Sequence, residues 1–197
     1  MQAPTKLNFK MYQGSTFSEV IRWESSTKVY KPITAITQAA PTVITSVGHG
    51  MPTGWRFQVS NVGGMTDINT STDVYYVAKT LTADTVEINS LNSLGFKTYT
   101  TGGVISYNQP VDLTSYTARM QLRATVDSTV IIDEYNTTNG KIQIDTTGKS
   151  ITVLIDATTT AGYSFSTAVY GLELVSGTGV VTQLATGTIT LIKEITR

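Results

Sequence analysis

The segment that decides how this chain is organised opens with Ile33-Thr34-Ala35-Ile36-Thr37 and Pro41-Thr42-Val43-Ile44-Thr45. It turns through Gly48-His49-Gly50 and closes with Tyr99-Thr100-Thr101-Gly102-Gly103. Short runs of β-branched residues separated by glycine turns are typical of a small β module. The sequence before and after this segment makes better sense joined than separated, so we expect one domain inserted into another.

The composition indicates a folded β protein. The chain has 197 residues, of which 40% are hydrophobic and 14% charged, which is too apolar for a disordered tail. Threonine is abundant, and valine, isoleucine and tyrosine are frequent. Because these side chains favour a pleated, half-buried surface, we expect an all-β fold.

Charge and residue counts argue against several classes of function. Lys plus Arg and Asp plus Glu both number 14, so no net field draws the chain to nucleic acid or to an anionic membrane. There is no cysteine and only one histidine, His49, which argues against disulfides, thiol chemistry and multi-histidine metal sites. Residues 1 to 6 lack the apolar stretch of a signal peptide, and no apolar run is long enough for a spanning helix. We expect synthesis in a cytoplasm, no cofactor and no metal.

Outside the segment, alternating patterns predict a series of strands. Residues 16 to 23 form the first, and Glu19 shares a face with Phe17 and Ile21, which indicates a sheet edge or a strand end. Residues 24 to 28 are polar and predict a turn. Further strands are predicted at residues 117–123, 130–133, 141–144, 150–155, 168–175 and 180–192. Turns are predicted at Asn139-Gly140, Thr147-Gly148 and Gly177-Thr178-Gly179, and Asn139-Gly140 is the strongest hairpin signal.

Inside the segment, strands are predicted at residues 42–46, 56–59, 74–80 and 85–89. Short strands of this kind can close into a small barrel, which removes its own edges. One helical turn is predicted near residue 157, with Asp156 as its N-cap and Gly162 as its stop.

These patterns together predict an immunoglobulin-like β-sandwich with a small β-barrel inserted after its first strands. The sandwich, which is the docking domain, would be discontinuous, formed by residues 1–31 and 108–197, and the barrel would comprise residues 32–107. The two ends of the insert must then lie close together, as inserted domains generally require.

The insert resembles the small β module named after the first catalytic cysteine half-domain of ubiquitin-activating enzymes, which recurs in bacteriophage tail proteins. The resemblance implies a fold and a context. It implies no ubiquitin chemistry, because the catalytic cysteine of those enzymes lies outside the module and this chain has none. The matching residues are Ile33-Thr34, Ile36-Thr37, Pro41-Thr42-Val43-Ile44-Thr45, Gly48-His49-Gly50, Gly54, Val59-Ser60, Val62, Gly64-Met65, Asn69, Tyr99-Thr100 and Gly102-Gly103.

The outer segments are similar to an immunoglobulin-like phage domain, the N-terminal attachment domain of baseplate receptor-binding-protein adaptors. In that pattern a short turn joins the first strand pair to a Val-Asp-Leu-Thr segment, and here the insert replaces the turn. The likeness is carried by Gln13-Gly14-Ser15-Thr16-Phe17, by Pro110-Val111-Asp112-Leu113-Thr114 with Tyr116-Thr117-Ala118-Arg119-Met120-Gln121 and Arg123, by Tyr170 with Leu172-Glu173-Leu174, and by Gly187-Thr188-Ile189-Thr190.

These resemblances imply a structural protein in the virion of a tailed bacteriophage, made in the host cytoplasm. It would dock on the tail or baseplate as a symmetric homo-oligomer and mediate assembly or attachment of neighbouring tail or fibre proteins. The expected partners are other virion structural proteins, with no nucleic acid and no membrane. Two alternatives stay open: a capsid decoration (cement) protein, and a module that binds a host receptor or host surface glycan.

Four aromatic residues of the insert are candidate contacts for a partner or a glycan, namely Trp55, Tyr75, Tyr76 and Tyr99. Exposed tryptophan and tyrosine often stack on sugar rings or anchor protein partners. Tyr75 and Tyr76 are adjacent and must face opposite sides of a strand, so at least one of them is expected in the core.

The remaining motifs favour structural roles, so we predict no enzyme and no catalytic residue. Gly148-Lys149-Ser150 lacks the upstream glycine and following helix of a phosphate-binding loop, and predicts a hairpin turn instead. His49 has no further ligands for a metal and is expected to bond a backbone carbonyl at a tight turn. Asp133 and Glu134 are adjacent in a strand and point to opposite faces, which does not suit a glycosidase pair.

Overall fold

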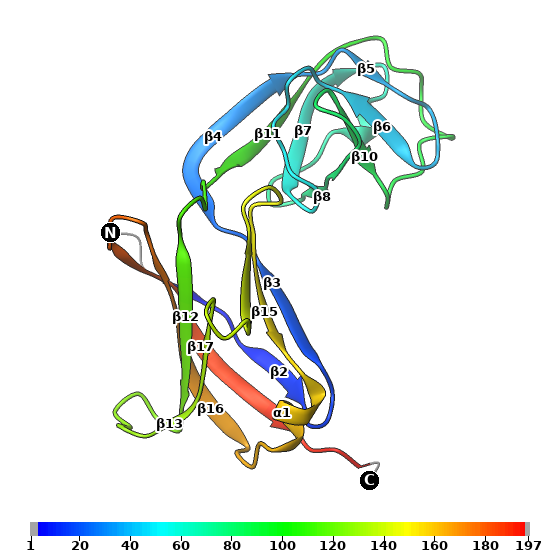
Figure 1. The fold of residues 1–197 in the computed structure, drawn as a ribbon. Helices are drawn as coiled ribbons and strands as arrows, with labels where there is room; N and C mark the ends of the chain where they lie inside the picture. The colour runs from blue at the N-terminus through cyan, green and yellow to red at the C-terminus, as the bar shows by residue number, and fades with distance from the viewer. Residues whose placement is uncertain (1–3, 196–197) are drawn as a thin grey trace. The chain divides into compact units, whose positions relative to one another are not determined.

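In a computed structural model, which describes residues 4–195, the protein is mostly β and divides into two compact units (Figure 1). Unit 1 comprises the residues up to Trp23 and those from Asp112 onward, and unit 2 comprises Glu24–Val111. The predicted limits of the insert, 32 and 107, lie inside unit 2. The unit extends beyond them because β4 (Glu24–Pro32) and β11 (Thr101–Pro110) form one antiparallel ladder.

Unit 1 contains a six-stranded mixed sheet. In it β16 (Thr167–Val175) lies between β12 (Thr117–Arg123) and β17 (Val181–Ile192), and β13 (Ile131–Asn136) forms one edge. At the other side β1 (Thr5–Lys6) and β2 (Phe9–Tyr12) pair in parallel with successive stretches of β17. Neither of these short strands was predicted, because a few residues carry too little alternation to be recognised.

A close backbone approach fixes the position of β1 and β2. Between them the chain crosses Gly187, where a side chain would collide with the carbonyl oxygen of Leu7. The Leu7 N–H donates to the Thr186 carbonyl at 2.8 Å, and Asn8 Oδ1 accepts from the Thr188 N–H at 3.1 Å. Glycine at position 187 is therefore required by the fold.

A second sheet of unit 1 has three strands, in the order β14 (Ile142–Asp145), β15 (Ser150–Ile155) and β3 (Phe17–Ile21). Among the described residues β3 pairs only with β15, so the predicted edge at Glu19 is confirmed. The predicted helical turn is also confirmed as α1 (Ala157–Ala161), where the Asp156 side chain accepts the Thr159 N–H at 2.8 Å.

Unit 2 contains two four-stranded sheets. One has the order β4, β11, β7 (Arg56–Gly63) and β8 (Tyr76–Val77), with η1 (Thr66–Ile68) following β7. The other has the order β5 (Ala35–Ile36), β6 (Thr42–Thr45), β10 (Thr85–Ile88) and β9 (Lys79–Thr80).

The single strand predicted at residues 74–80 was wrong, because it is split between the two sheets of unit 2 at Ala78. The Ala78 N–H donates to the Trp55 carbonyl at 2.8 Å, and the Ala78 carbonyl accepts from Gly54 at 2.7 Å. These two bonds hold the chain at the point where it leaves the side of β7 and continues beside β10. β8 therefore pairs with β7, and β9 pairs with β10.

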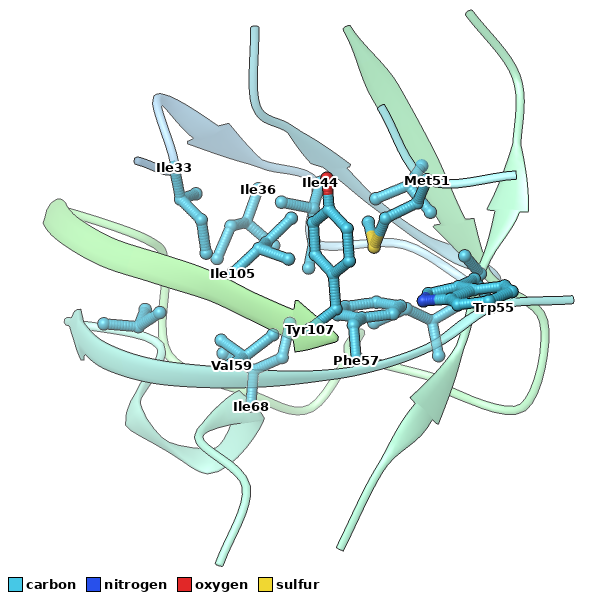
Figure 2. Packing of buried hydrophobic residues seen from close by; sticks show 14 of the residues in the cluster. Ile33, Ile36, Ile44, Met51, Trp55, Phe57, Val59, Ile68, Ile105 and Tyr107 are labelled. Atoms are coloured by element: carbon cyan, nitrogen blue, oxygen red, sulfur yellow. The ribbon is translucent and has the colours of Figure 1, made fainter. Parts of the chain in front are cut away.

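Both sheets of unit 2 contribute to one apolar core (Figure 2). Ile44 comes from the sheet of β6, whereas Phe57 and Ile105 come from the sheet of β7, and all three have no exposed surface. Unit 2 therefore has a hydrophobic core of its own.

Two turn predictions need correction. Residues 24–28 are not a turn but the first half of β4, whose polar composition reflects its position at the edge of its sheet. Asn139-Gly140 is a turn, but it joins β13 to β14, which belong to different sheets, so it is no hairpin. The turns predicted at Thr147-Gly148 and at residues 177–179 are confirmed, and they form the β14–β15 and β16–β17 hairpin connections.

Candidate functional site

The four candidate aromatic residues do not form one platform. Trp55 has no exposed surface, and its indole N–H donates to the Asn108 carbonyl at 2.8 Å within unit 2 (Figure 2). Its role as a partner or glycan contact is therefore corrected: it is a core residue whose polar atom is satisfied internally.

The three tyrosines are partly buried and each makes a separate local contact. The Arg56 guanidinium lies 4.9 Å from the centre of the Tyr75 ring. Tyr76 packs against Phe57 and donates to the Ile68 carbonyl at 3.2 Å, which agrees with the expectation that one residue of this pair faces the core. The Tyr99 hydroxyl lies 2.9 Å from the Gly102 carbonyl oxygen. The tyrosine hydroxyls mainly close loops of unit 2.

Beside Tyr75, the side chains of Arg56 and Glu24 form a bidentate ion pair of 2.6 and 2.8 Å. Burial by itself would raise the pKa of Glu24. Hydrogen bonds from Arg56 and Asn108 outweigh that effect, and the pKa lies below its ordinary value. The carboxylate therefore stays ionised at neutral pH and joins β4 to β7.

His49 has the structural role that the sequence predicts. Its side chain is 1% exposed, with Nε2 lying 3.2 Å from the Thr82 carbonyl oxygen, while Nδ1 accepts the Met51 N–H at 3.1 Å. Because Nδ1 accepts, Nε2 must carry the proton and donate. The ring thus holds two loops of unit 2 together.

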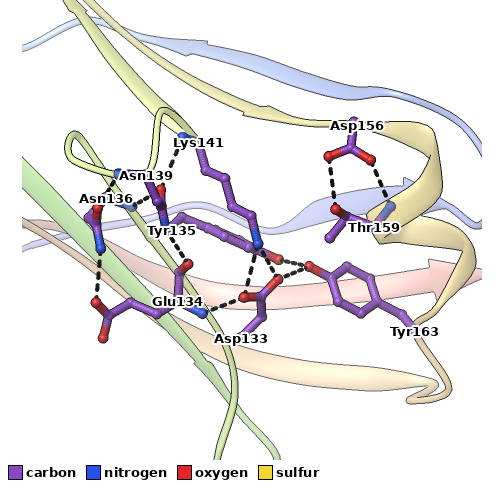
Figure 3. Close-up of polar contacts among 9 residues, drawn as sticks. All are labelled: Asp133, Glu134, Tyr135, Asn136, Asn139, Lys141, Asp156, Thr159 and Tyr163. Atoms are coloured by element: carbon purple, nitrogen blue, oxygen red, sulfur yellow. Dashed lines mark hydrogen bonds and ion pairs between the residues drawn. The ribbon is translucent and has the colours of Figure 1, made fainter.

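Asp133 and Glu134 face different partners, as the adjacent positions predict (Figure 3). Asp133 accepts from the Tyr163 hydroxyl at 2.5 Å and from the Lys141 ammonium at 2.8 Å, and Tyr163 and Tyr135 are joined through their hydroxyls at 2.7 Å. Asp133 also accepts the N–H of Glu134. We call Asp133, Tyr135, Lys141 and Tyr163 the phenol network.

The phenol network is suited to packing rather than to proton transfer. Burial raises the pKa of Tyr163, and its hydrogen bond to Asp133 raises the pKa further. Burial likewise raises the pKa of Tyr135. Both phenols therefore stay protonated at neutral pH, and the Asp133 carboxylate is occupied by internal donors.

The polar groups of the Gly148-Lys149 turn are bound by carboxylates of the same chain. The Asp145 carboxylate accepts the N–H groups of Thr147 and Gly148 at 2.9 and 2.8 Å, so these donors are not available to a phosphate. Lys149 forms an ion pair of 2.9 Å with Asp112. The hydrogen bond from Lys149, together with those from Thr114, lowers the pKa of Asp112 from 3.8 to about 2.

A groove of about 800 Å³ lies on the outward face of the six-stranded sheet, and the sequence analysis did not find it. We call it the sheet groove. Its centre is a cross-strand row in which Glu134, Gln121, Gly171, Thr186 and Lys6 stand on successive strands. Gly171 has no side chain, so only the flexible end of the Gln183 side chain lies near the middle of the row.

Charged and amide side chains border the sheet groove. On one side Arg119 and Glu173 form an ion pair of 2.7 Å, and on the other Arg123 donates to Gln121 at 2.8 Å. Hydrogen bonds from Gln121 and Asn136 lower the pKa of Glu134, so this carboxylate is ionised. The alternation of Arg119, Gln121 and Arg123 marked the outward face of β12 in the sequence, but nothing marked the strands that stand beside it.

Among residues 4–195 no group of three or more His, Cys, Asp or Glu side chains is placed to hold a metal ion. In the same part of the chain no helix is both long and apolar enough to cross a bilayer. No protein-family model matches the sequence, and no curated protein matches it.

Proposed function

We propose that unit 1 is an immunoglobulin-like β-sandwich and that unit 2 is a small closed β-barrel. In unit 1, the phenol network supports this proposal, because it ties Asp133 of the six-stranded sheet to Lys141 at the start of β14. In unit 2, the shared core of the two sheets supports it. The Ile33 and Thr34 N–H groups, which bond Gly103 and Thr45, carry the chain from one sheet to the other.

The protein would be a non-enzymatic structural component of a tailed-phage virion that docks on the tail or baseplate. One observation carries this proposal: a compact β unit is inserted between the first strands and the remainder of another, in the two segments that resemble phage tail modules. Copies arranged in a symmetric ring would make individually weak contacts collectively firm.

Docking through a sheet edge requires backbone groups that are not already bonded. The β13 edge is closed in this respect. Thr137 donates to Ala118 across the ladder, so the backbone groups of Glu134 and Asn136 point away from β12. Asp133 accepts the Glu134 N–H at 2.7 Å, and Asn139 bonds both the Glu134 carbonyl and the Asn136 N–H.

The β3 edge is better suited to dock a strand of a neighbouring subunit. Leu154 donates to Lys141, which turns the odd-numbered residues of β15 toward β3 and leaves the backbone groups of Ser18 and Val20 pointing outward. Both side chains are exposed, with Val20 at 48%. A partner strand here would extend the three-stranded sheet.

Incorporation of variants into particles tests this docking mode. Val20→Pro removes an N–H that faces away from β15, so we expect the fold to be retained and incorporation to be lost. Val20→Lys should weaken incorporation, whereas Val180→Lys, at another exposed valine of unit 1, should have no effect. Normal incorporation of Val20→Pro would contradict docking through β3.

Localisation of the protein in purified particles tests the wider assignment. We expect antibody labelling at the tail or baseplate and a copy number of about a dozen, as a ring of subunits provides. A copy number in the hundreds, with label over the head, would indicate a capsid decoration protein. Absence from particles would overturn the virion assignment.

A further inference from the structure

The sheet groove is kept open by a glycine that the fold does not require. Gly171 lies in β16, a central strand, where glycine is less favourable than a residue with a side chain. Its φ angle is not among the positive ones, and an added Cβ would meet only the end of the flexible Gln183 side chain at 3.3 Å. Gly187, one strand away, contrasts with it, because there a Cβ would collide with backbone.

Glycine in a strand marks a bulge or the close approach of another molecule. The β16–β17 ladder shifts register between Leu172 and Glu173, but Gly171 itself pairs regularly with Thr186, so we interpret this glycine as leaving room for a ligand. The groove lies directly over this position and is bordered by side chains from β1, β12, β13, β16 and β17. Its floor and walls can therefore contact a ligand that lies flat on the sheet.

The lining is unlike that of a site for an apolar small molecule, which is mainly hydrophobic and aromatic. Its outward side chains are mainly charged groups, amides and hydroxyls, together with the exposed Val126 and the half-buried Val169, and Tyr170 beneath them is only 5% exposed. These groups suit a ligand that carries many hydroxyls. Gln183, Thr186 and Lys6 make no side-chain hydrogen bond within residues 4–195, so they are available to it.

The charges favour an anion. Three cations, Lys6, Arg119 and Arg123, face two carboxylates, Glu134 and Glu173, which leaves one net positive charge. Arg119 is paired with Glu173, but within the described residues Lys6 and Arg123 form no ion pair with a carboxylate. Arg123 already donates to the Ser128 carbonyl and to Gln121, so its remaining N–H groups are the ones that can bind a carboxylate or phosphate.

A saccharide fits this face better than an acidic peptide. Backbone hydrogen bonds of a sheet run within its plane, so a peptide lying on the face finds no backbone partners. A sugar chain carries its donors and acceptors around each ring and can be held by side chains alone. We propose that the sheet groove binds an acidic saccharide, with its rings over Gly171 and its acidic groups toward Lys6 and Arg123.

This site does not depend on the virion assignment, and direct binding to the full chain tests it. Oligogalacturonate and dextran phosphate serve as carboxylate and phosphate probes, with neutral dextran and a poly-glutamate peptide as comparisons. We expect calorimetric binding of at least one acidic saccharide, weakened by salt, and none of dextran. Comparing the two acidic probes identifies the acidic group.

Gly171→Val is the decisive variant. A β-branched side chain favours the strand, so we expect unchanged or higher stability in urea unfolding, together with a loss of affinity of at least tenfold. Gly95→Val, at a glycine of unit 2 with open space around it, is the matched control and should bind normally. Lys6→Gln should lower the affinity roughly threefold and Lys97→Gln should not.

Three outcomes would overturn the proposal. The first is that no acidic saccharide binds the unmodified protein. The second is that folded Gly171→Val binds as well as the unmodified protein, which would place binding elsewhere. The third is equal binding of poly-glutamate that Gly171→Val also removes, which would assign the groove to an acidic polypeptide.

Discussion

Buried polar side chains are arranged differently in the two units. In unit 2 they bond mainly the backbone of loops: Ser46 donates to the Pro32 carbonyl at 2.9 Å, and His49 lies 3.2 Å from the Thr82 carbonyl oxygen. Thr42 and Ser93, which are joined at 2.9 Å, both bond the Ala39 carbonyl. In unit 1 the phenol network joins four side chains: the Asp133 carboxylate binds Lys141 and Tyr163, and Tyr163 binds Tyr135 (Figure 3). The polar side chains of unit 2 are therefore satisfied mainly by loop backbone, whereas those of the phenol network in unit 1 are satisfied by one another.

Strand length explains the difference. β5, β8 and β9 of unit 2 have two residues each, so much of its backbone lies in loops and needs side-chain partners. β16 and β17 of unit 1 have nine and twelve residues, and their ladder satisfies most backbone groups. We infer that the stability of unit 2 depends mainly on its apolar core. The stability of unit 1 depends in addition on the phenol network, so a single substitution in that network should lower it.

The largest expected effect comes from removing one unit completely. Replacing residues 24–111 with a short glycine-containing turn should leave unit 1 folded, because both ends of the removed segment lie outside the strands of unit 1. Replacing only residues 32–107 should give a less stable product, because most of β4 would remain without β11. The measurement is the urea unfolding midpoint followed by circular dichroism. Two equally unfolded products would show that the units share a core.

Trp55→Ala should destabilise unit 2 by roughly 3–5 kcal/mol, the usual cost of emptying a buried aromatic position. Trp55 has no exposed surface and also loses its bond to Asn108. Chemical unfolding should then show an early transition for unit 2, with the transition of unit 1 unchanged. Trp55→Phe is the milder control, and a single transition shifted as a whole would refute separate stability.

Asp133→Ala should lower the stability of unit 1 by about 2–3 kcal/mol, because Lys141 and Tyr163 would lose a charged acceptor. Tyr163→Phe removes one hydroxyl from the same network and should cost about 1–2 kcal/mol. The exposed Asp127→Asn is the control in the same unit. If both network variants unfold like the control, the phenol network contributes no stability.

The smallest effect is expected at the ion pair of the half-buried Lys149 with the exposed Asp112. The pKa of Asp112 is lowered to about 2, so the ionised form stabilises the fold above pH 3.8 and this contribution is lost as the pH falls toward 2. Lys149→Gln should move the pKa back toward 3.8 in a carboxyl-carbon NMR titration. Global stability at neutral pH should hardly change, because exposed ion pairs contribute little. An unchanged titration would show that Lys149 does not set this pKa.

Local patterns predicted some elements to the residue. The strands at Thr117–Arg123 and Ser150–Ile155 were predicted with the bounds that the structure has, because one face of each is buried and alternation is strict. The cap at Asp156 was predicted because a carboxylate beside free N–H groups is a local interaction. The polar residues in the first half of β4 predict a turn, because the sequence of a polar edge strand resembles that of a loop when its partner strand is not known.

The candidate site was predicted less well. Trp55 was a reasonable surface candidate by residue type, yet its position in the core of unit 2 depends on strands that lie far apart in the sequence. Gly171 carried no signal as a single glycine. Its meaning appears only when Gln121 and Thr186 stand on either side of it.

The sequence by itself determined that the protein is mostly β, where its clearest strands and its helical turn lie, and that His49 closes a turn. These features depend on side-chain alternation and on bonds between near neighbours. The tertiary structure alone decided which strands pair, where the units divide, which aromatic residue is buried and how the sheet groove forms. Each of these results from residues that are distant in the chain and adjacent in the sheet, and no local pattern specifies that pairing.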